Sequence, residues 1–145
     1  FLTALQNGEI NPLLFSRVYW NYIYETICNP RVSLIEYISL PYRVKTCLSK
    51  YNTIFIYGAG QLGNEIYQLL SRTGFSDNVK GFVVTDKHEN PSAISNVRVY
   101  SIDEILYDED TLIIVAVGNR YIDEVQKILI EKKYKNRLLK REFYG

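Results

Sequence analysis

The chain has 145 residues, 47% of them hydrophobic, which is enough for one core, so we expect a single main domain with at most an appendage. Its net charge of +1 provides no field that would attract nucleic acid or an anionic membrane. No apolar run approaches the roughly 20 residues of a membrane-spanning helix, so we expect no transmembrane segment and a cytoplasmic location. Because the chain begins with Phe1 and contains no methionine, we expect a domain excised from a longer protein.

Residues 1–50 differ in composition from the rest and predict a helical arm. Asn11 and Pro12 form a favourable helix start, and Pro30 should end that helix. A second helical region is predicted from about Ser33 to Lys50, interrupted near Pro41. Three interpretations stay open: a linker from a preceding domain, a helical cap packed on a sheet, or a homodimer surface formed by the aromatic helices.

The arm also contains an aromatic stripe and both cysteines. The stripe predicts core or interface packing, because base-stacking platforms normally accompany a basic groove and only Arg17 lies within it. Cys28 and Cys47 belong to no metal-binding pattern, and we expect two free thiols in a reducing compartment, with a disulfide between them as the alternative. The stripe comprises Phe15, Tyr19, Trp20, Tyr22 and Tyr24.

Residues 53–63 carry the strongest motif of the chain. The apolar run Thr53 to Tyr57 predicts a strand that leads into a G-x-G-x-x-G turn at Gly58, Gly60 and Gly63. In such a turn the first glycine permits the tight bend, the second lets backbone approach a phosphate, and the third allows close helix packing. The following helix would direct its N-terminus at the ligand.

The segments after this turn complete a strand, helix, strand unit. Apolar residues recur at helical spacing from Leu62 to Leu70, and Gly74 is placed to end the helix in the left-handed conformation. Residues 79–86 form a second β-rich run that ends in Asp86, about 20 residues after the glycines. A carboxylate at that distance is typical of ribose binding, although Thr85-Asp86-Lys87 is also an ordinary turn signal.

Residues 97–106 predict a short strand, Val97 to Tyr100, and a short helix, Ser101 to Leu106. The helix rests on a capping box, in which Ser101 is followed three residues later by Glu104. The acidic residues between 103 and 110 have no calcium-loop spacing and predict a solvated face.

A second strand and glycine turn follow. Thr111 to Val117 is a continuous apolar run, typical of a central strand covered on both faces, and Gly118 and Asn119 then open another helical pattern. Because ligands bind beyond the carboxyl ends of parallel strands, the two glycine turns should face each other there. The tail from Asn136 could supply a fifth strand. The basic residues 132–141 are interpreted as a solvated face, with anion contact as the alternative.

Together, residues 52–135 resemble the Rossmann-like domains associated with bacterial polysaccharide-biosynthesis enzymes, among them sugar acyltransferases, nucleotide-sugar dehydratases, methyltransferases and glycosyltransferases. The resemblance implies an α/β fold over residues 51–145, an open parallel sheet of four to five strands preceded by the arm. It implies a bound nucleotide or nucleotide-sugar, or a scaffolding role, and the position of Asp86 adds NAD as a candidate cofactor. By position, phosphate would approach Gly58, Ala59, Gly60, Gln61 and Leu62, ribose or base would approach Asp86, and Gly118 and Asn119 would line the opposite wall.

Residues for catalysis are not evident in the sequence. No tyrosine precedes a lysine at the spacing that short-chain oxidoreductases use, and the single histidine, His88, lies in a polar loop, where a surface position is expected. Three hypotheses therefore stay open: a non-catalytic nucleotide or nucleotide-sugar module, a fragment of an NAD-dependent nucleotide-sugar dehydratase or dehydrogenase, and a ligand-free interaction scaffold.

Overall fold

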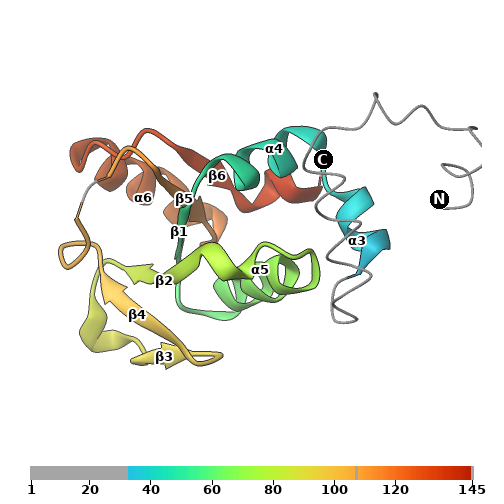
Figure 1. Ribbon diagram of the computed structural model, residues 1–145. Helices are drawn as coiled ribbons and strands as arrows, with labels where there is room; N and C mark the ends of the chain where they lie inside the picture. The colour runs from blue at the N-terminus through green and yellow to red at the C-terminus, as the bar shows by residue number, and fades with distance from the viewer. Residues whose placement is uncertain (1–32, 107, 145) are drawn as a thin grey trace, which may run out of the picture.

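A computed structural model describes residues 33–106 and 108–144 (Figure 1). It begins with two short helices, α3 (Leu34–Ser39) and α4 (Tyr42–Lys50), separated at Pro41 as predicted. The Ser33 hydroxyl caps α3 by accepting a hydrogen bond from the Glu36 backbone N–H at 3.3 Å. The helix predicted from Asn11, the aromatic stripe and Cys28 lie outside the described residues.

A six-stranded sheet forms the centre of the fold. Its strands are β1 (Thr53–Tyr57), β2 (Val79–Val84), β3 (Ala93–Ile94), β4 (Val97–Ser101), β5 (Thr111–Val115) and β6 (Arg137–Leu139). Their spatial order is β3-β4-β2-β1-β5-β6, and every neighbouring pair is parallel except β3 and β4. The predicted α/β, Rossmann-like fold is confirmed, and β6 is the fifth parallel strand expected from the tail.

Two longer helices connect the central strands. α5 (Gln61–Arg72) joins β1 to β2, and α6 (Asn119–Glu131) joins β5 to β6. Gly74 ends the α5 region with a φ of 85°, the left-handed conformation predicted for it. Short 3-10 helices lie at η2 (Ser76–Asn78), η3 (Lys87–Glu89) and η4 (Lys140–Tyr144). Within the described residues, no helix has the length and apolar character needed to cross a membrane.

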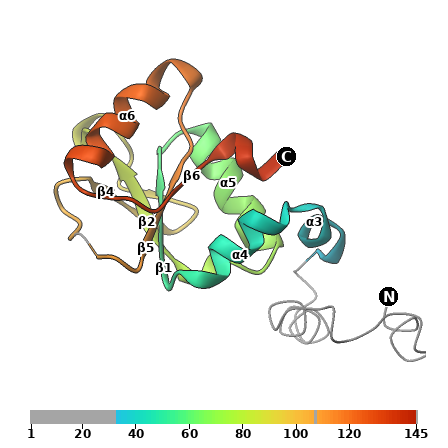
Figure 2. The ribbon, with the colours of Figure 1, turned by 90° about the horizontal axis from the view of Figure 1, so that it is seen from above.

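Helices cover both faces of the central strands, and successive side chains of each strand point to opposite faces. Figure 2 shows α4 and α5 on one side of the sheet and α6 on the other. Ile54 and Ile56 of β1 pack in a first core with α4 and α5, whereas Tyr57 packs in a second core with α6. This explains why residues 111–115 of β5 are continuously apolar or threonine and wholly buried.

The second part of the arm belongs to the first core. Leu40, Val44 and Leu48 are each at most 5% exposed and form one apolar cluster with the strand residues Ile54 and Ile56. Residues 40–48 therefore pack on the sheet as a helical cap.

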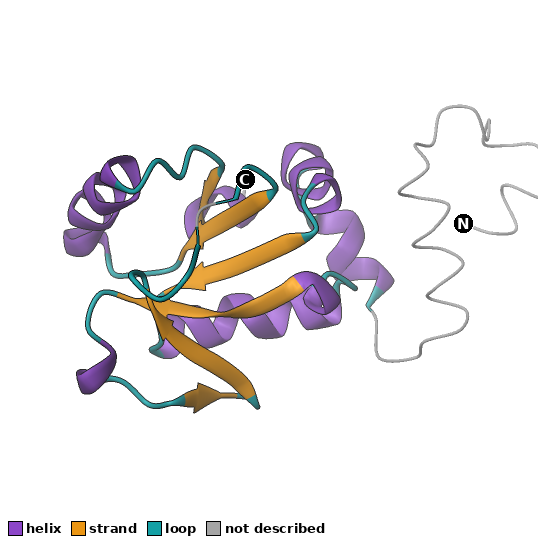
Figure 3. Cartoon of the chain, turned by 60° about the vertical axis from the view of Figure 1, so that its left-hand side comes forward, coloured by secondary structure: helices purple, strands orange, loops and turns teal. Residues whose placement is uncertain are grey.

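The edge beyond β2 differs from the prediction. No helix forms over residues 101–106: β4 continues through Ser101, which pairs with Val84, and a turn follows. One bond of the capping box forms, since Glu104 Oε1 accepts from the Ser101 N–H at 3.1 Å, but the Ser101 hydroxyl accepts from the Asp103 N–H at 3.3 Å, and both bonds stabilise a turn. Strand pairing of Ser101 outweighs the local helix signal. The two-residue strand β3 lies beside β4 at this edge (Figure 3).

Candidate functional site

A cleft of about 690 Å³ lies at the carboxyl ends of β1, β2 and β5. Both glycine turns line it, as does the segment after β2, so residues that are distant in sequence meet at one place. Its walls consist of residues 57–62, 84–86, 89, 90, 116–118, 121, 124 and 125. The two turns face this cleft together because each follows one of two neighbouring parallel strands.

Gly58 is required by the backbone. Its φ of 126° is a conformation that side-chain-bearing residues rarely adopt, and a Cβ added there would lie 2.3 Å from the carbonyl oxygen of Ala116. The chain is held at this point, because the Gly58 N–H donates to the Val83 carbonyl at 2.9 Å and the Ala116 N–H donates to the Tyr57 carbonyl at 2.9 Å. Gly58 therefore lets the turn pass directly against β5.

Gly63 is required by packing. A Cβ at this position would lie 2.0 Å from the Gly58 carbonyl oxygen and 3.5 Å from the Phe82 ring. Gly63 is buried in the first turn of α5 and does not line the cleft. Its place in the motif is thus explained by the contact between α5 and the turn.

Gly60 and Gly118 have no such structural explanation. A Cβ at Gly60 would meet no atom within 4 Å, and the φ of −100° is accessible to any residue. At Gly118 the φ is −59°, and a Cβ would make only an ordinary 3.7 Å contact with the Tyr121 ring. Both glycines line the cleft. Glycine at these positions keeps two stretches of backbone uncovered on the cleft side.

The same two glycines are the N-caps of α5 and α6. Neither helix has a side-chain hydrogen bond at its cap. The first four N–H groups of a helix have no partner within it, and they carry the positive end of the helix dipole. Backbone of this kind, left bare by glycine, is suited to bind an anionic group such as a phosphate.

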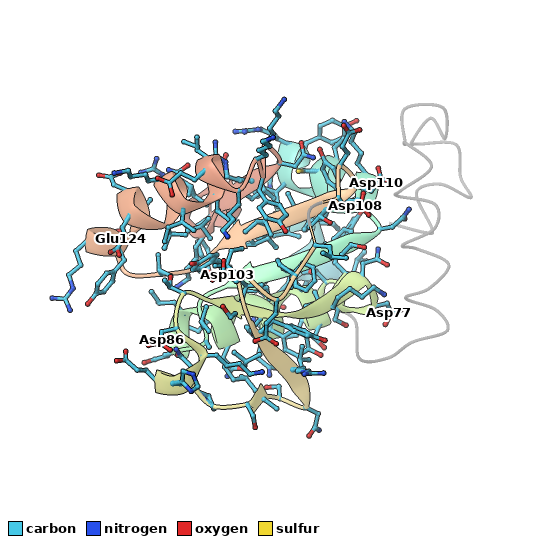
Figure 4. The ribbon with its side chains drawn as sticks, turned by 90° about the vertical axis from the view of Figure 1, so that its left-hand side faces the viewer. Asp77, Asp86, Asp103, Asp108, Asp110 and Glu124 are labelled. Atoms are coloured by element: carbon cyan, nitrogen blue, oxygen red, sulfur yellow. The ribbon has the colours of Figure 1, made fainter. Side chains whose placement is uncertain are left out.

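Charged side chains in the cleft are all acidic. Asp86, Glu89 and Glu124 line it, and no lysine or arginine is found among its described lining residues. Figure 4 shows Asp86 and Glu124 at one end of the sheet and Asp77, Asp108 and Asp110 at the other. The guanidinium of Arg120 stacks on the Tyr121 ring, 4.6 Å from its centroid, and does not line the cleft. The positively polarised groups at the cleft are therefore the backbone N–H groups at the two helix N-termini.

Asp86 lies two residues beyond the end of β2 and is the N-cap of η3. One carboxylate oxygen, Oδ1, accepts a hydrogen bond from the His88 backbone N–H at 2.9 Å, and the side chain is exposed at the cleft. His88 is exposed as predicted. The carboxylate of Asp86 thus serves the turn with one oxygen and retains acceptor capacity at the other.

Tyr57 and Thr85 join the ends of β1 and β2 at the cleft. Their hydroxyl oxygens lie 2.6 Å apart. Burial raises the pKa of Tyr57, the Thr85 hydrogen bond opposes that rise, and the nearby carboxylates of Glu124 and Asp103 add to it. The phenol is therefore protonated at neutral pH, and this part of the cleft is polar without being charged.

The remaining predicted residues divide between the cleft and its surroundings. Ala59, Gln61 and Leu62 line the cleft, whereas Asn119 lines a neighbouring cavity. Gln61 also donates from Nε2 to Glu65 Oε1 at 3.3 Å. Across the described part of the chain, no group of three or more His, Cys, Asp or Glu side chains could hold a metal ion.

Sequence reasoning missed several cleft residues. Tyr57 and Thr85 directly precede Gly58 and Asp86, and residues at strand ends beside a glycine turn could have been included on that ground. Tyr121 and Glu124 lie in the first two turns of α6, on the side that faces the cleft. The sequence feature that could have linked Tyr121 with Glu124 is their separation of three residues, which places the two side chains on the same face of a helix.

No protein-family model matches the chain, and no curated protein matches it.

Proposed function

We propose that this chain is a non-catalytic module that binds a nucleotide or nucleotide-sugar in the cleft, as part of a larger bacterial polysaccharide-biosynthesis protein. One observation carries the proposal. Gly58 and Gly63 are explained by the fold, but Gly60 borders only open space on the cleft side. A fold that merely needed a turn and a packed helix has no use for glycine at position 60.

A diphosphate is the group that best fits the middle of the cleft. The N-termini of α5 and α6 both open there, at Gly60 and Gly118, and supply N–H donors and a positive dipole end. The cleft volume, about 690 Å³, lies within the ~300–1,000 Å³ of small-molecule sites. A diphosphate would be held by backbone and would require no lysine or arginine.

The ribose fits the end of the cleft where Asp86 lies. A carboxylate oxygen with acceptor capacity accepts hydrogen bonds from ribose hydroxyls, the usual contact at the end of the second strand of this fold. The Tyr57 and Thr85 hydroxyls provide further polar groups beside it. The link to polysaccharide biosynthesis is supported by the sequence resemblance alone.

A second candidate function is favoured by Asp86 itself. An NAD-dependent nucleotide-sugar dehydratase or dehydrogenase, with catalytic residues outside this chain, would place the adenosine ribose against this carboxylate. The negative charges of Asp86 and Glu89 would repel the 2′-phosphate of NADP. This candidate predicts clear preference for NAD over NADP, and equal binding of the two would remove its support.

A calorimetric panel tests the proposal. Purified protein is titrated with NAD, NADP, UDP, CMP and several UDP-sugars, and the titrations are repeated with Gly60→Val. Gly60 lines the cleft and a Cβ there meets no atom within 4 Å, so the variant should stay folded, with its unfolding midpoint lowered only by the weaker helix cap, and should lose nucleotide binding. Undiminished binding by the variant, or no binding by the natural protein to any member of the panel, would contradict the proposed site and favour a ligand-free scaffold.

A further inference from the structure

A second cavity, of about 410 Å³, adjoins the cleft on the side of β6. The two share three lining residues, Leu62, Val117 and Gly118, so they form neighbouring compartments along the carboxyl edge of the sheet. The second compartment is closed by residues 139–141 and 144, which follow or end β6. A ligand that lies in the cleft and extends beyond Gly118 would therefore reach into this second compartment.

The two compartments carry opposite charge. The cleft is lined by three carboxylates and no cation, whereas the second cavity is lined by Lys140 and Arg141 and by no acidic residue. Lys140 is engaged, since its Nζ lies 2.8 Å from Glu65 Oε2 and lowers the pKa of that carboxyl group. Arg141 is exposed and forms no ion pair with any residue that the structure describes. Arg141 is therefore the cation available to a ligand.

Only part of the basic cluster near the C-terminus takes part in this cavity. Lys132, the C-cap of α6, is paired with Asp103, and Lys133 and Lys135 are exposed; none of the three lines the cavity. The solvated face expected from sequence thus describes these residues, whereas Lys140 and Arg141 are brought to the cavity by the return of the chain through β6. Their position beside the cleft is the feature that requires an explanation.

We propose that the second cavity is a subsite for an acidic sugar, so that the ligand is a nucleotide-sugar bearing a carboxylate. This inference rests on the proposed function and narrows its ligand class. The ribose lies near Asp86, the diphosphate near Gly60 and Gly118, and the sugar beyond them, with its carboxylate on Arg141. A guanidinium matches the planar carboxylate geometry with two parallel hydrogen bonds.

The remaining walls of the cavity fit the rest of a sugar. Ile122, Leu139 and the ring of Tyr144 provide apolar surface that can cover the carbon side of the pyranose. Asn119 adds amide donors and an acceptor for hydroxyl groups. A neutral sugar would use these contacts and leave Arg141 without a partner.

The test compares three ligands by calorimetry at low ionic strength: UDP, UDP-glucose and UDP-glucuronate, which differ by the sugar and then by its carboxylate. UDP-glucuronate should bind about two- to fivefold more tightly than UDP-glucose, the range expected for one exposed ion pair. Arg141→Ala should remove this preference and leave UDP affinity unchanged within about twofold. Arg141→Lys should retain part of it.

Lys127→Ala is the matched control, because it removes one positive charge from an exposed position of α6 outside both compartments. It should keep the preference for UDP-glucuronate. Equal binding of the two sugars, or a preference that survives Arg141→Ala, would overturn the subsite while UDP binding upholds the nucleotide site. Failure of all three ligands to bind would overturn the subsite, whereas the nucleotide site is contradicted only if NAD, NADP and CMP also fail to bind.

Discussion

Alanine at Gly58 and alanine at Gly60 should have very different effects on stability, although the two glycines are two residues apart. At Gly58 the new Cβ meets the Ala116 carbonyl oxygen at 2.3 Å, and the backbone is held at a φ of 126°. The neighbouring backbone is fixed by the hydrogen bond from the Ala116 N–H to the Tyr57 carbonyl. At Gly60 the Cβ meets nothing.

The expected magnitudes follow from these contacts. A strained conformation at Gly58 costs roughly 1–3 kcal/mol, and overpacking against a fixed backbone adds about 1–3 kcal/mol, so we expect a loss near 4 kcal/mol. Domains of this size have a free energy of unfolding of about 5–15 kcal/mol, so this is a large share of the total. Gly60→Ala weakens the helix cap, which destabilises the protein, but it also makes the unfolded chain less flexible, which stabilises it. The net change in the free energy of unfolding should stay within about 1 kcal/mol.

Urea unfolding followed by circular dichroism measures the difference. With a denaturant slope of about 2 kcal/mol per molar, the midpoint of Gly58→Ala should fall by about 2 M relative to the natural protein, and that of Gly60→Ala by less than about 0.5 M. Equal midpoints for the two variants would refute the conclusion that the fold requires glycine at position 58 but tolerates a side chain at position 60. A large loss of stability in Gly60→Ala alone would mean that the fold itself requires glycine at position 60, which would remove the observation that supports a ligand site there.

Three further outcomes are expected. Burial raises the pKa of Tyr57 above its ordinary value of 10.0, so the stability that the protonated phenol contributes is complete below pH 10 and is lost as the pH rises further. In urea unfolding at increasing alkaline pH, Tyr57→Phe should therefore lose less free energy of unfolding than the natural protein, and equal losses would contradict this. Burial also raises the pKa of the Cys47 thiol. In the Cys28→Ser variant, Cys47 should therefore react with a thiol reagent more slowly in the folded protein than in the protein unfolded by urea, and identical rates would be inconsistent with burial. Gly60→Ser should supply the missing cap of α5 and raise the free energy of unfolding by a few tenths of a kcal/mol while weakening nucleotide binding, and a stable variant with full affinity would count against the site.

The central strands and helices were predictable because their signals are local. Thr53 to Tyr57 and Thr111 to Val115 are apolar runs that end at glycine turns, and α5 carries an apolar stripe at helical spacing that ends at Gly74. Such patterns determine burial directly. The pairing of β1 with β2 and of β5 with β6 agrees with their short connections through α5 and α6, whereas the place of β5 beside β1 is set by no local connection.

The edge of the sheet could not be read in the same way. The strand β3 has only two residues and exists because Ala93 and Ile94 pair with β4. At Ser101 the capping signal predicted a helix, but Ser101 pairs with Val84 in the sheet instead. In both places a long-range backbone contact decides the structure, and no local pattern reports it.

The candidate site shows the same division. The glycine turns and Asp86 were found from their spacing, because the fold places these positions at the ligand edge. The distinction between Gly60, which faces open space, and Gly63, which packs on Gly58, requires coordinates. Arg141 reaches the cavity beside the cleft through the pairing of β6 with β5, which the sequence does not encode locally.

An NMR titration of the uniformly ¹⁵N-labelled protein tests the central claim most directly. Addition of the best ligand of the calorimetric panel should shift the amide signals of Gly60, Gln61, Leu62 and Gly118, and leave that of Gly74, at the opposite end of α5, unchanged. Shifts confined to these positions would place the ligand on the two helix N-termini. A ligand that shifts other amides and leaves Gly60 and Gly118 unmoved would contradict the account.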